Sequence, residues 1–293
     1  MNLMRYKNFY FAISLLFLLP GIFSLIFFGL RPSIDFTGGS ALEIQFAQNP
    51  ENLVFATDSG FQEILAANYD YSVLQSVGEA RVIVKGKEIN NQEKDQLIET
   101  LEQNYGELEL LRFETVGPSL GSELLNKTFI ALLIVAFSIT IYVWRQFNEL
   151  KYGVCAILAM LHDTLILLGA FSLLGYFGGV EVDLLFVTAL LTAMSFSVHD
   201  TIIVYDRIRE LKRRNPRASF AEIANAAVLE TLSRSINNSM TIIIMLLTLV
   251  VLGGESTRLF AVALLVGAIT GTYSSTFTAV PLLLSWDRFF RKK

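Results

Sequence analysis

Six stretches of the chain are apolar and almost free of charged side chains over lengths that match a lipid bilayer. The first, residues 8–30, contains no charged residue in 23 positions. The other five stretches are 128–144, 152–180, 184–205, 235–254 and 259–286. A helix needs about 20 mostly apolar residues to cross the hydrocarbon core of a membrane. The sequence therefore predicts an α-helical integral membrane protein with six transmembrane helices.

The composition supports this class and excludes several others. Of the 293 residues, 53% are hydrophobic and 17% are charged, whereas soluble domains carry about 25% charged residues. The single cysteine, Cys155, excludes an internal disulfide, and the net charge of −4 gives no reason to expect a nucleic-acid partner. We see no nucleotide-binding, metal-binding or catalytic motif, so we expect no cofactor, no metal and no enzymatic activity.

Residues 31–127 differ from the rest of the chain in charge. They contain 16 acidic and 7 basic residues, whereas the rest contains 11 acidic and 16 basic residues. The hydrophobic pattern predicts a β-α-β-β-α-β order, which is the split βαβ or ferredoxin-like arrangement. The expected elements are strand 40–46, helix 55–69, strands 71–77 and 80–85, helix 90–105 and strand 108–115. Because no catalytic set is visible there, we expect a small α+β binding or docking domain outside the membrane.

Lysine and arginine set the expected orientation, because they are enriched in the cytoplasmic loops of membrane proteins. The N-terminal segment, the loop at 145–151, the loop at 206–234 and the tail at 287–293 are all basic, whereas the loops at 175–183 and 252–258 carry only Arg258. We therefore expect both termini in the cytoplasm and the domain 31–127 on the extracytoplasmic side. No small-x-small cleavage site follows the first span, so we expect that span to stay as an anchor.

The loop at 206–234 is predicted to contain a helix. Ser219 and Glu222 have the spacing of a capping box, which predicts a helix over 219–232 that leads into the fifth span or lies beside it. The basic residues between 207 and 217 could bind anionic lipid headgroups. The positive-inside rule explains them equally well, and we favour that explanation.

Polar residues inside the predicted spans are the candidates for function. A charge at the centre of a bilayer costs about 2.5–3.5 kcal/mol on insertion scales, so it usually has a partner or a function. The third span contains His162 and Asp163, and the fourth contains His199 and Asp200. A polar stripe with helical spacing opens the fifth span and consists of Arg234, Asn237, Asn238 and Thr241.

Asp200 and Arg234 are expected to lie at a similar depth in the membrane. At 1.5 Å per residue, Asp200 is roughly 9 Å inside the cytoplasmic end of its span. The fourth and fifth spans run antiparallel, so the two side chains can pair. Such a pair could act as a proton relay or could only hold two helices together, and the residues leave both possibilities open. For Asp163 we expect a buried hydrogen bond with His162.

Small residues mark one face of the last span. Gly267 and Gly271 have the small-xxx-small spacing that lets two transmembrane helices approach closely. This pattern predicts tight helix packing and no chemistry.

Several short motifs occur in a fixed order along the chain. They are Asp35-Phe36-Thr37-Gly38-Gly39 after the first span, His199-Asp200-Thr201 followed by Asp206-Arg207-Ile208-Arg209-Glu210, Thr231-Leu232-Ser233-Arg234, and Gly271-Thr272-Tyr273-Ser274-Ser275. With the layout of one span, an outer domain and five spans, they resemble the SecF family over nearly the whole chain. SecF proteins are the smaller membrane subunits of the bacterial SecD–SecF protein-export complex, within the resistance-nodulation-division superfamily.

The resemblance implies a role in protein export. The complex assists the Sec translocon channel in the bacterial inner membrane and uses the proton-motive force to promote translocation and release of preproteins at the outer face. Asp200 matches the family's transmembrane aspartate and Arg234 its partner arginine, both tied to proton transport. The family commonly has Asn before the aspartate, where this chain has His199. His199 could modulate the proton relay of Asp200 and Arg234, or it could form a hydrogen bond where Asn would, and we favour the hydrogen bond. The change makes the pKa of Asp200 harder to predict.

The resemblance also implies a partner. Many superfamily members repeat the unit of one span, an outer domain and five spans, whereas this chain has one copy, which would leave polar faces of the fourth and fifth spans against lipid. We therefore expect an obligate heteromer with SecD. Two rival functions are a subunit of a proton-coupled exporter of small molecules or lipids and a non-transporting scaffold of the translocon. The small acidic outer domain disfavours the exporter, and a silent Asp200→Asn change would favour the scaffold.

Overall fold

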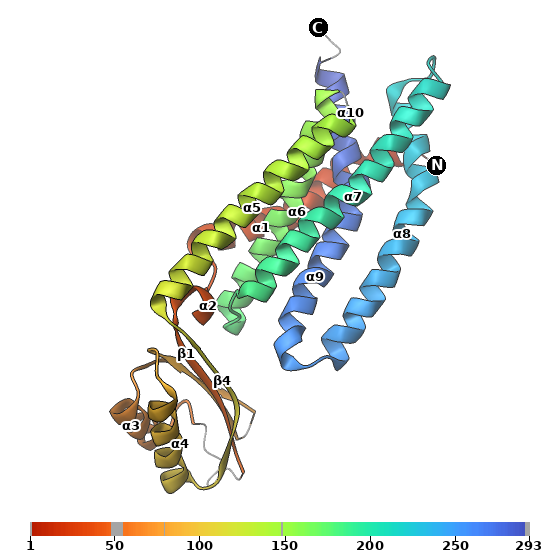
Figure 1. Cartoon of the computed structure of the whole chain (residues 1–293). Coiled ribbons are helices and arrows are strands. Elements are labelled where there is room, and N and C mark those ends of the chain that lie inside the picture. Colours follow the sequence, from red (N-terminus) through yellow and green to blue (C-terminus); the bar gives the residue numbers. More distant parts are fainter. Residues whose placement is uncertain (1, 48–54, 79, 148, 291–293) are drawn as a thin grey trace. The chain divides into compact units, whose positions relative to one another are not determined.

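The computed structural model describes residues 2–47, 55–78, 80–147 and 149–290. It divides the chain into two compact units, one formed by Met1–Arg31 with Ile130–Lys293 and the other by Pro32–Phe129. The first unit is a bundle of helices and the second contains all four strands of the described chain (Figure 1).

Six helical segments of the described chain are long and apolar enough to cross a membrane, which confirms the predicted number. Their elements are the 3-10 helix η1 (Leu3–Tyr6) with α1 (Lys7–Phe27), α5 (Pro118–Gln146), α6 (Leu150–Gly178), α7 (Leu184–Arg214), α8 (Phe220–Leu252), and α9 (Glu255–Ser274) with the π-helical η2 (Ser275–Ala279) and α10 (Val280–Phe290). The chain is thus a mostly helical, multi-pass membrane protein.

The bundle is not packed equally on all sides. Helix α9 lies against both α7 and α8, α6 lies against both α1 and α7, and these contacts form its interior. In contrast, no residue in the most apolar part of α5 is buried within this chain, and only 17% of the corresponding part of α8 is buried. The outer faces of α5 and α8 therefore remain free for lipid or for another protein.

Two predicted boundaries differ from the structure. The segment 206–234 is mostly helical, because α7 continues to Arg214 and α8 begins at Phe220, so only residues 215–219 connect the two helices. The capping box is present: the Glu222 N–H donates to Ser219 Oγ over 3.3 Å, and the Ser219 N–H donates to Glu222 Oε2 over 2.9 Å. Helix 219–232 therefore leads into the fifth span as one continuous helix. Residues 291–293 of the predicted tail lie outside the described residues.

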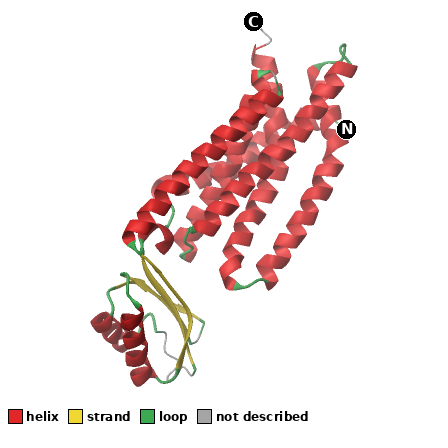
Figure 2. Ribbon diagram, in the orientation of Figure 1, coloured by secondary structure: helices red, strands yellow, loops and turns green. Residues whose placement is uncertain are grey.

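The smaller unit is built on one antiparallel sheet. In chain order its elements are α2 (Ile34–Thr37), β1 (Gly39–Phe46), α3 (Ser59–Asn68), β2 (Tyr71–Val77), β3 (Arg81–Gly86), α4 (Asn91–Tyr105) and β4 (Leu108–Val116). The strand order is β2-β3-β1-β4, so β3 lies between β1 and β2, and β1 lies between β3 and β4. The strands are yellow in Figure 2. Both helices α3 and α4 contribute to the core, where Phe61, Leu65, Leu97 and Leu101 are almost fully buried.

Local chemistry explains how the helices of this unit begin. Helix α3 starts at Ser59, later than predicted, because Asp58 caps it by accepting a hydrogen bond from the Phe61 N–H over 2.7 Å. Helix α4 starts with a complete capping box between Asn90 and Glu93. Strand β1 alternates buried and half-buried residues along most of its length, as expected for a strand with one face on a core.

Candidate functional site

Asp200 is a buried carboxylate that accepts no hydrogen bond from the residues that the structure describes. It lies on α7 with 1% of its surface exposed. Within the described part of the chain, neither of its carboxylate oxygens has a hydrogen-bond partner. His199 Nδ1 lies 3.5 Å from Asp200 Oδ1, but 66% of the His199 side chain is exposed and the contact does not have hydrogen-bond geometry. A buried charge without partners is unfavourable, and a proton or another cation bound to this carboxyl would remove that charge.

The expected pairing of Asp200 with Arg234 is not observed. The ion pairs between described residues, with nitrogen–oxygen distances up to 4.0 Å, do not include Arg234. The reason is the rotation of α8, since Ser235 and Ser239 point into the bundle and are buried, whereas Arg234 is exposed. Asn237, Asn238 and Thr241 are exposed on the same side as Arg234. The structure thus keeps the predicted polar stripe together but turns it away from Asp200.

Asp163 contrasts with Asp200, because its carboxylate is surrounded by donors. It lies on α6 and is 5% exposed. Ser197 Oγ on α7 donates to Asp163 Oδ2 over 2.6 Å, and Ser274 Oγ on α9 donates to the same oxygen. His162 Nδ1 lies 2.9 Å from Asp163 Oδ1, as the sequence predicted for this pair. One carboxylate therefore connects three helices of the bundle.

Close helix contacts bring these donors together. A methyl group built at Gly267 would lie 2.5 Å from Cβ of Ala193, and one at Gly271 would lie 3.2 Å from Cα of Ser197. Both glycines of the small-xxx-small pair thus face α7, where no side chain fits between the helices. This approach places Ser197 and Ser274 on the same oxygen of Asp163.

Hydroxyl groups extend this polar layer through the bundle. Thr272 Oγ1 donates to Ser239 Oγ over 2.7 Å and thereby joins α9 to α8. Ser14 and Thr278 hydroxyls lie 2.9 Å apart and join α1 to η2. The π-helical turn η2 interrupts the regular hydrogen bonds of the last span, and Tyr205 Oη donates to the carbonyl of Ala279 over 2.8 Å. π-helical turns occur frequently at functional sites.

Sequence reasoning missed Ser197 and assigned only packing to Ser274. A signal for Ser197 exists, because it precedes Asp200 by three residues and therefore lies on the same face of α7. No comparable signal exists for Ser274, since its contact with α6 depends on how the helices pack. Among the described residues, no group of three or more His, Cys, Asp or Glu side chains is arranged to hold a metal ion.

The Asp35, Gly38 and Gly39 motif forms a tight junction within the smaller unit. Gly38 has φ of 74°, and a methyl group there would lie 2.7 Å from Cα of Pro118. Gly39 has φ of 118°, and a methyl group built there would collide with the carbonyl oxygen of Gly86. Both positions therefore need glycine, for the backbone conformation and for lack of space. Asp35 lies in the first turn of α2, where its N–H donates to Ser33 Oγ over 3.2 Å.

Comparison with known families identifies relatives of the whole chain. The family model "Protein export membrane protein SecD/SecF, C-terminal" matches residues 96–288. The model "SecD/SecF GG Motif" matches residues 23–50, which include Gly38 and Gly39. The protein translocase subunit SecF of Thermobaculum terrenum is 40% identical, covering 99% of this chain and 97% of the relative. The SecF subunit of Anaerolinea thermophila is 37% identical, covering 98% and 94%.

Solved structures give the same result. The crystal structure of SecDF, a translocon-associated membrane protein from Thermus thermophilus, is 31% identical with a TM-score of 0.85. It is matched by 98% of this chain, which spans 39% of the SecDF chain. SecDF in its super-membrane-facing form gives 32% identity and a TM-score of 0.72 over 100% of this chain and 39% of that one. The chain belongs to the SecF family of protein translocase subunits.

Proposed function

We propose that this chain is an accessory subunit of the Sec protein translocase. It works with SecD and the translocon channel and uses the proton-motive force across the bacterial inner membrane to promote preprotein translocation and release at the outer face. Near full-length similarity to SecF translocase subunits supports this assignment and disfavours an exporter of small molecules or lipids. The structural observation that carries the ion-coupled part is the buried carboxylate of Asp200, which has no hydrogen-bond partner among the described residues.

Asp200 is the ion-binding group in this proposal. Binding of a proton removes its buried charge, whereas release restores a charge that the bundle does not stabilise. The free energy of the bundle therefore depends on whether Asp200 is occupied, which is the requirement for coupling an ion gradient to a change of conformation. His199, next to it in sequence and largely exposed, offers a route for the proton between Asp200 and the outer face of α7.

Asp163 has a different role in the same proposal. Its three partners come from α6, α7 and α9, so it holds the helices around Asp200 in one arrangement. Ser197 connects the two acids, because it bonds to Asp163 and lies one helical turn from Asp200 on α7. A shift of α7 on ion binding would therefore change the hydrogen bond between Ser197 and Asp163.

The exposed stripe on α8 supports a partner subunit. Arg234, Asn237, Asn238 and Thr241 are exposed in this chain. A lone chain would turn an arginine and two amides toward lipid, which is costly. SecD covers this face in the proposed complex, and Arg234 then meets an acid of SecD or reaches Asp200 after a rearrangement. The SecDF chain is more than twice as long as the part matched here, which leaves room for such a partner within it.

The smaller unit completes the proposed topology. We assign it a ferredoxin-like fold, because its element order and strand order have the split βαβ arrangement. Its acidic character and the basic loops of the bundle support a position on the extracytoplasmic side, with both termini in the cytoplasm. There it serves as a docking domain for SecD or for an emerging preprotein.

Preprotein export in depleted cells tests the ion-coupled part of the proposal. Rescue with Asp200→Asn is compared with rescue by the wild-type chain, and Asp206→Asn on the same helix serves as the matched control. Asp206 accepts hydrogen bonds from Gln146 and Arg209 and lies away from the buried layer. We expect Asp200→Asn to assemble with SecD but to leave export at the depleted level, whereas Asp206→Asn restores it. Full rescue by Asp200→Asn would instead favour a scaffold without ion transport.

A further inference from the structure

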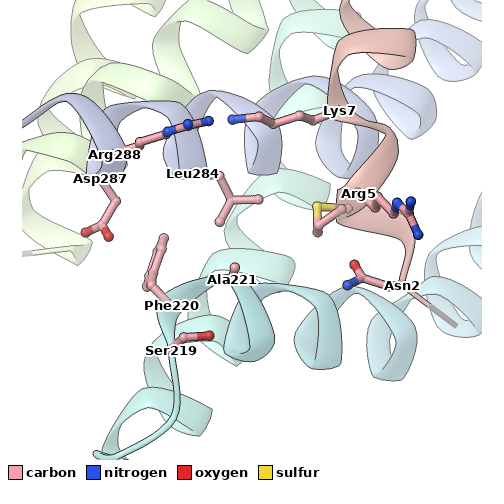
Figure 3. Close-up of a pocket in the computed structure, with 10 residues that line it drawn as sticks. Asn2, Arg5, Lys7, Ser219, Phe220, Ala221, Leu284, Asp287 and Arg288 are labelled. Atoms are coloured by element: carbon pink, nitrogen blue, oxygen red, sulfur yellow. The ribbon is translucent and has the colours of Figure 1, made fainter.

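A cavity of about 720 Å³ opens at the end of the bundle where η1, α8 and α10 meet. Figure 3 shows its walls, which are lined by Asn2, Met4, Arg5, Lys7, Ser219, Phe220, Ala221, Leu284, Asp287 and Arg288. None of these residues belongs to the polar layer around Asp200 and Asp163. The cavity is therefore a separate feature of the bundle.

Basic side chains converge on this cavity. The nitrogen-bearing ends of Lys7 and Arg288 point toward one another across it, whereas the guanidinium of Arg5, which also lines the cavity, points away from them (Figure 3). Among the described residues, none of these three cations forms an ion pair within 4.0 Å. Asp287 is the acid on the wall, and its Oδ1 lies 3.8 Å from Nζ of Lys151. Like charges that converge without an acid between them repel, and an anion bound between them removes that repulsion.

The first turn of α8 adds to the positive potential. Ser219, Phe220 and Ala221 line the cavity, and α8 is a helix of 33 residues whose N-terminal end carries a partial positive charge. The wall is also held in place. Asn225 Oδ1 on α8 accepts hydrogen bonds from the N–H groups of Leu3 over 2.8 Å and Met4 over 3.4 Å. These bonds fix η1, and with it Arg5 and Lys7, against α8.

Apolar side chains form the other walls of the cavity. Met4 and Phe220 are 5% and 7% exposed, and Leu284 is half-buried. Helix α1 has 21 residues from Lys7, and at 1.5 Å per residue it spans about 30 Å, the thickness of the hydrocarbon core. Lys7 therefore lies at the edge of that core, where the phosphates of lipids begin. Trp286, two residues before Arg288, is a type of residue enriched at this level.

We propose that this cavity binds the headgroup of an anionic phospholipid from the leaflet that meets this end of the bundle. The phosphate lies between Lys7 and Arg288 near the first turn of α8, and the glycerol and upper acyl chains lie on Met4, Phe220 and Leu284. The net negative charge of a lipid such as phosphatidylglycerol matches the excess of cations, whereas the choline of phosphatidylcholine adds a further positive charge. The bound lipid would link η1, α8 and α10 at the membrane surface.

Native mass spectrometry of the full chain tests this site. The protein is purified in detergent, mixed with phosphatidylglycerol or phosphatidylcholine, and the fraction that retains a lipid is measured. Lys7→Gln with Arg288→Gln removes two charges from the cavity, and Arg213→Gln with Arg217→Gln removes two exposed charges elsewhere at the same end. Each basic residue near a membrane surface contributes about 1 kcal/mol, which is about fivefold in affinity. We expect the cavity variant to lose about 25-fold in phosphatidylglycerol affinity and the control to change less than about twofold.

Four further outcomes decide the proposal. Lys7→Arg with Arg288→Lys keeps both charges and should retain the lipid even if the neutral variant folds poorly. Equal losses in the cavity variant and the control would mean diffuse surface attraction and would overturn the site. Glycerol phosphate is added as a competitor, and displacement of the lipid at equal concentration would make this a site for free phosphate rather than for phospholipid. Equal retention of phosphatidylcholine would also overturn the proposal.

Discussion

Two buried acids in the same bundle have opposite surroundings. Asp163 accepts hydrogen bonds from Ser197 and Ser274 and contacts His162, whereas Asp200 has no hydrogen-bond partner within the described chain. Both are at most 5% exposed. Burial alone therefore does not distinguish Asp163 from Asp200, the acid that we propose binds an ion, whereas their hydrogen-bond partners do. A satisfied carboxylate stabilises one arrangement of helices, whereas an unsatisfied one makes the arrangement depend on its charge.

Removal of Asp163 should have the largest effect on stability. Asp163→Ala leaves two buried hydroxyls and a histidine without their common acceptor, and it leaves a space between three helices. We expect the free energy of unfolding to fall by about 3 kcal/mol. A denaturant titration of the purified chain in detergent measures this. A loss below about 1 kcal/mol would mean that the acid holds no helices together, and the contrast with Asp200 would disappear.

A change at Gly267 should separate α9 from α7 and so weaken the surroundings of Asp163 without touching Asp200. In Gly267→Ala the added methyl lies 2.5 Å from Cβ of Ala193, and such overpacking costs about 1–3 kcal/mol. Ala193→Gly removes the opposing methyl and should restore most of the lost stability in the double variant.

Gly254→Ala provides the matched control for this helix. A methyl group at Gly254 would meet no atom within 4 Å, so the substitution should be nearly neutral. Thermal unfolding of the four variants in one detergent gives the comparison. Absence of rescue by Ala193→Gly would show that the contact between α9 and α7 does not limit stability.

Tyr69, which lies outside the six spans, tests whether the hydrogen-bond partners of a buried group decide which charge state the fold stabilises. The expected effect is the smallest of the four. Its hydroxyl donates to the carbonyls of Ser40 over 3.1 Å and Lys87 over 3.0 Å. Burial, with a smaller contribution from the charge of Asp70, raises the pKa of Tyr69 to about 12. Because the folded state holds this proton more tightly, its stabilisation is complete below pH 10 and is lost as the pH rises toward 12. We expect a loss of about 1–2 kcal/mol over this range.

Tyr69→Phe is the control for that prediction. Phenylalanine has no titratable hydroxyl, so the pH dependence between 10 and 12 should be weaker than in the wild-type chain. Circular dichroism of the β-strand signal along a denaturant series measures it. An identical slope for both proteins would exclude Tyr69 as the source.

The sequence predicts much of the fold because its signals are local. Apolar length is sufficient to find six spans, and the hydrophobic pattern places β1 and α4 of the smaller unit within one residue of their observed bounds. The two intramembrane acids are also evident, since a charge in an apolar stretch needs no structural information to be found. The continuation of 219–232 into α8 follows from the absence of a breaking residue after Ser219.

The contacts within the candidate site depend on the rotation of each helix about its axis and on how the helices pack. Arg234 is exposed because the small residues Ser235 and Ser239 occupy the inner face of α8, and a sequence does not specify this rotation. The same limit applies to Ser274, whose contact with Asp163 exists only because Gly267 and Gly271 let α9 approach α7. Polar stripes can thus be recognised from sequence, whereas the groups they meet cannot.

The difference between the two acids is tested most directly by unfolding Asp200→Asn and Asp163→Asn side by side in the same detergent. Asparagine keeps the shape of each side chain and removes the charge. We predict that Asp200→Asn is as stable as the wild-type chain or more stable, because an unsatisfied buried charge is lost, while Asp163→Asn loses about 1–2 kcal/mol. Equal destabilisation of the two variants would contradict the assignment of Asp200 as a carboxyl kept without partners for ion binding.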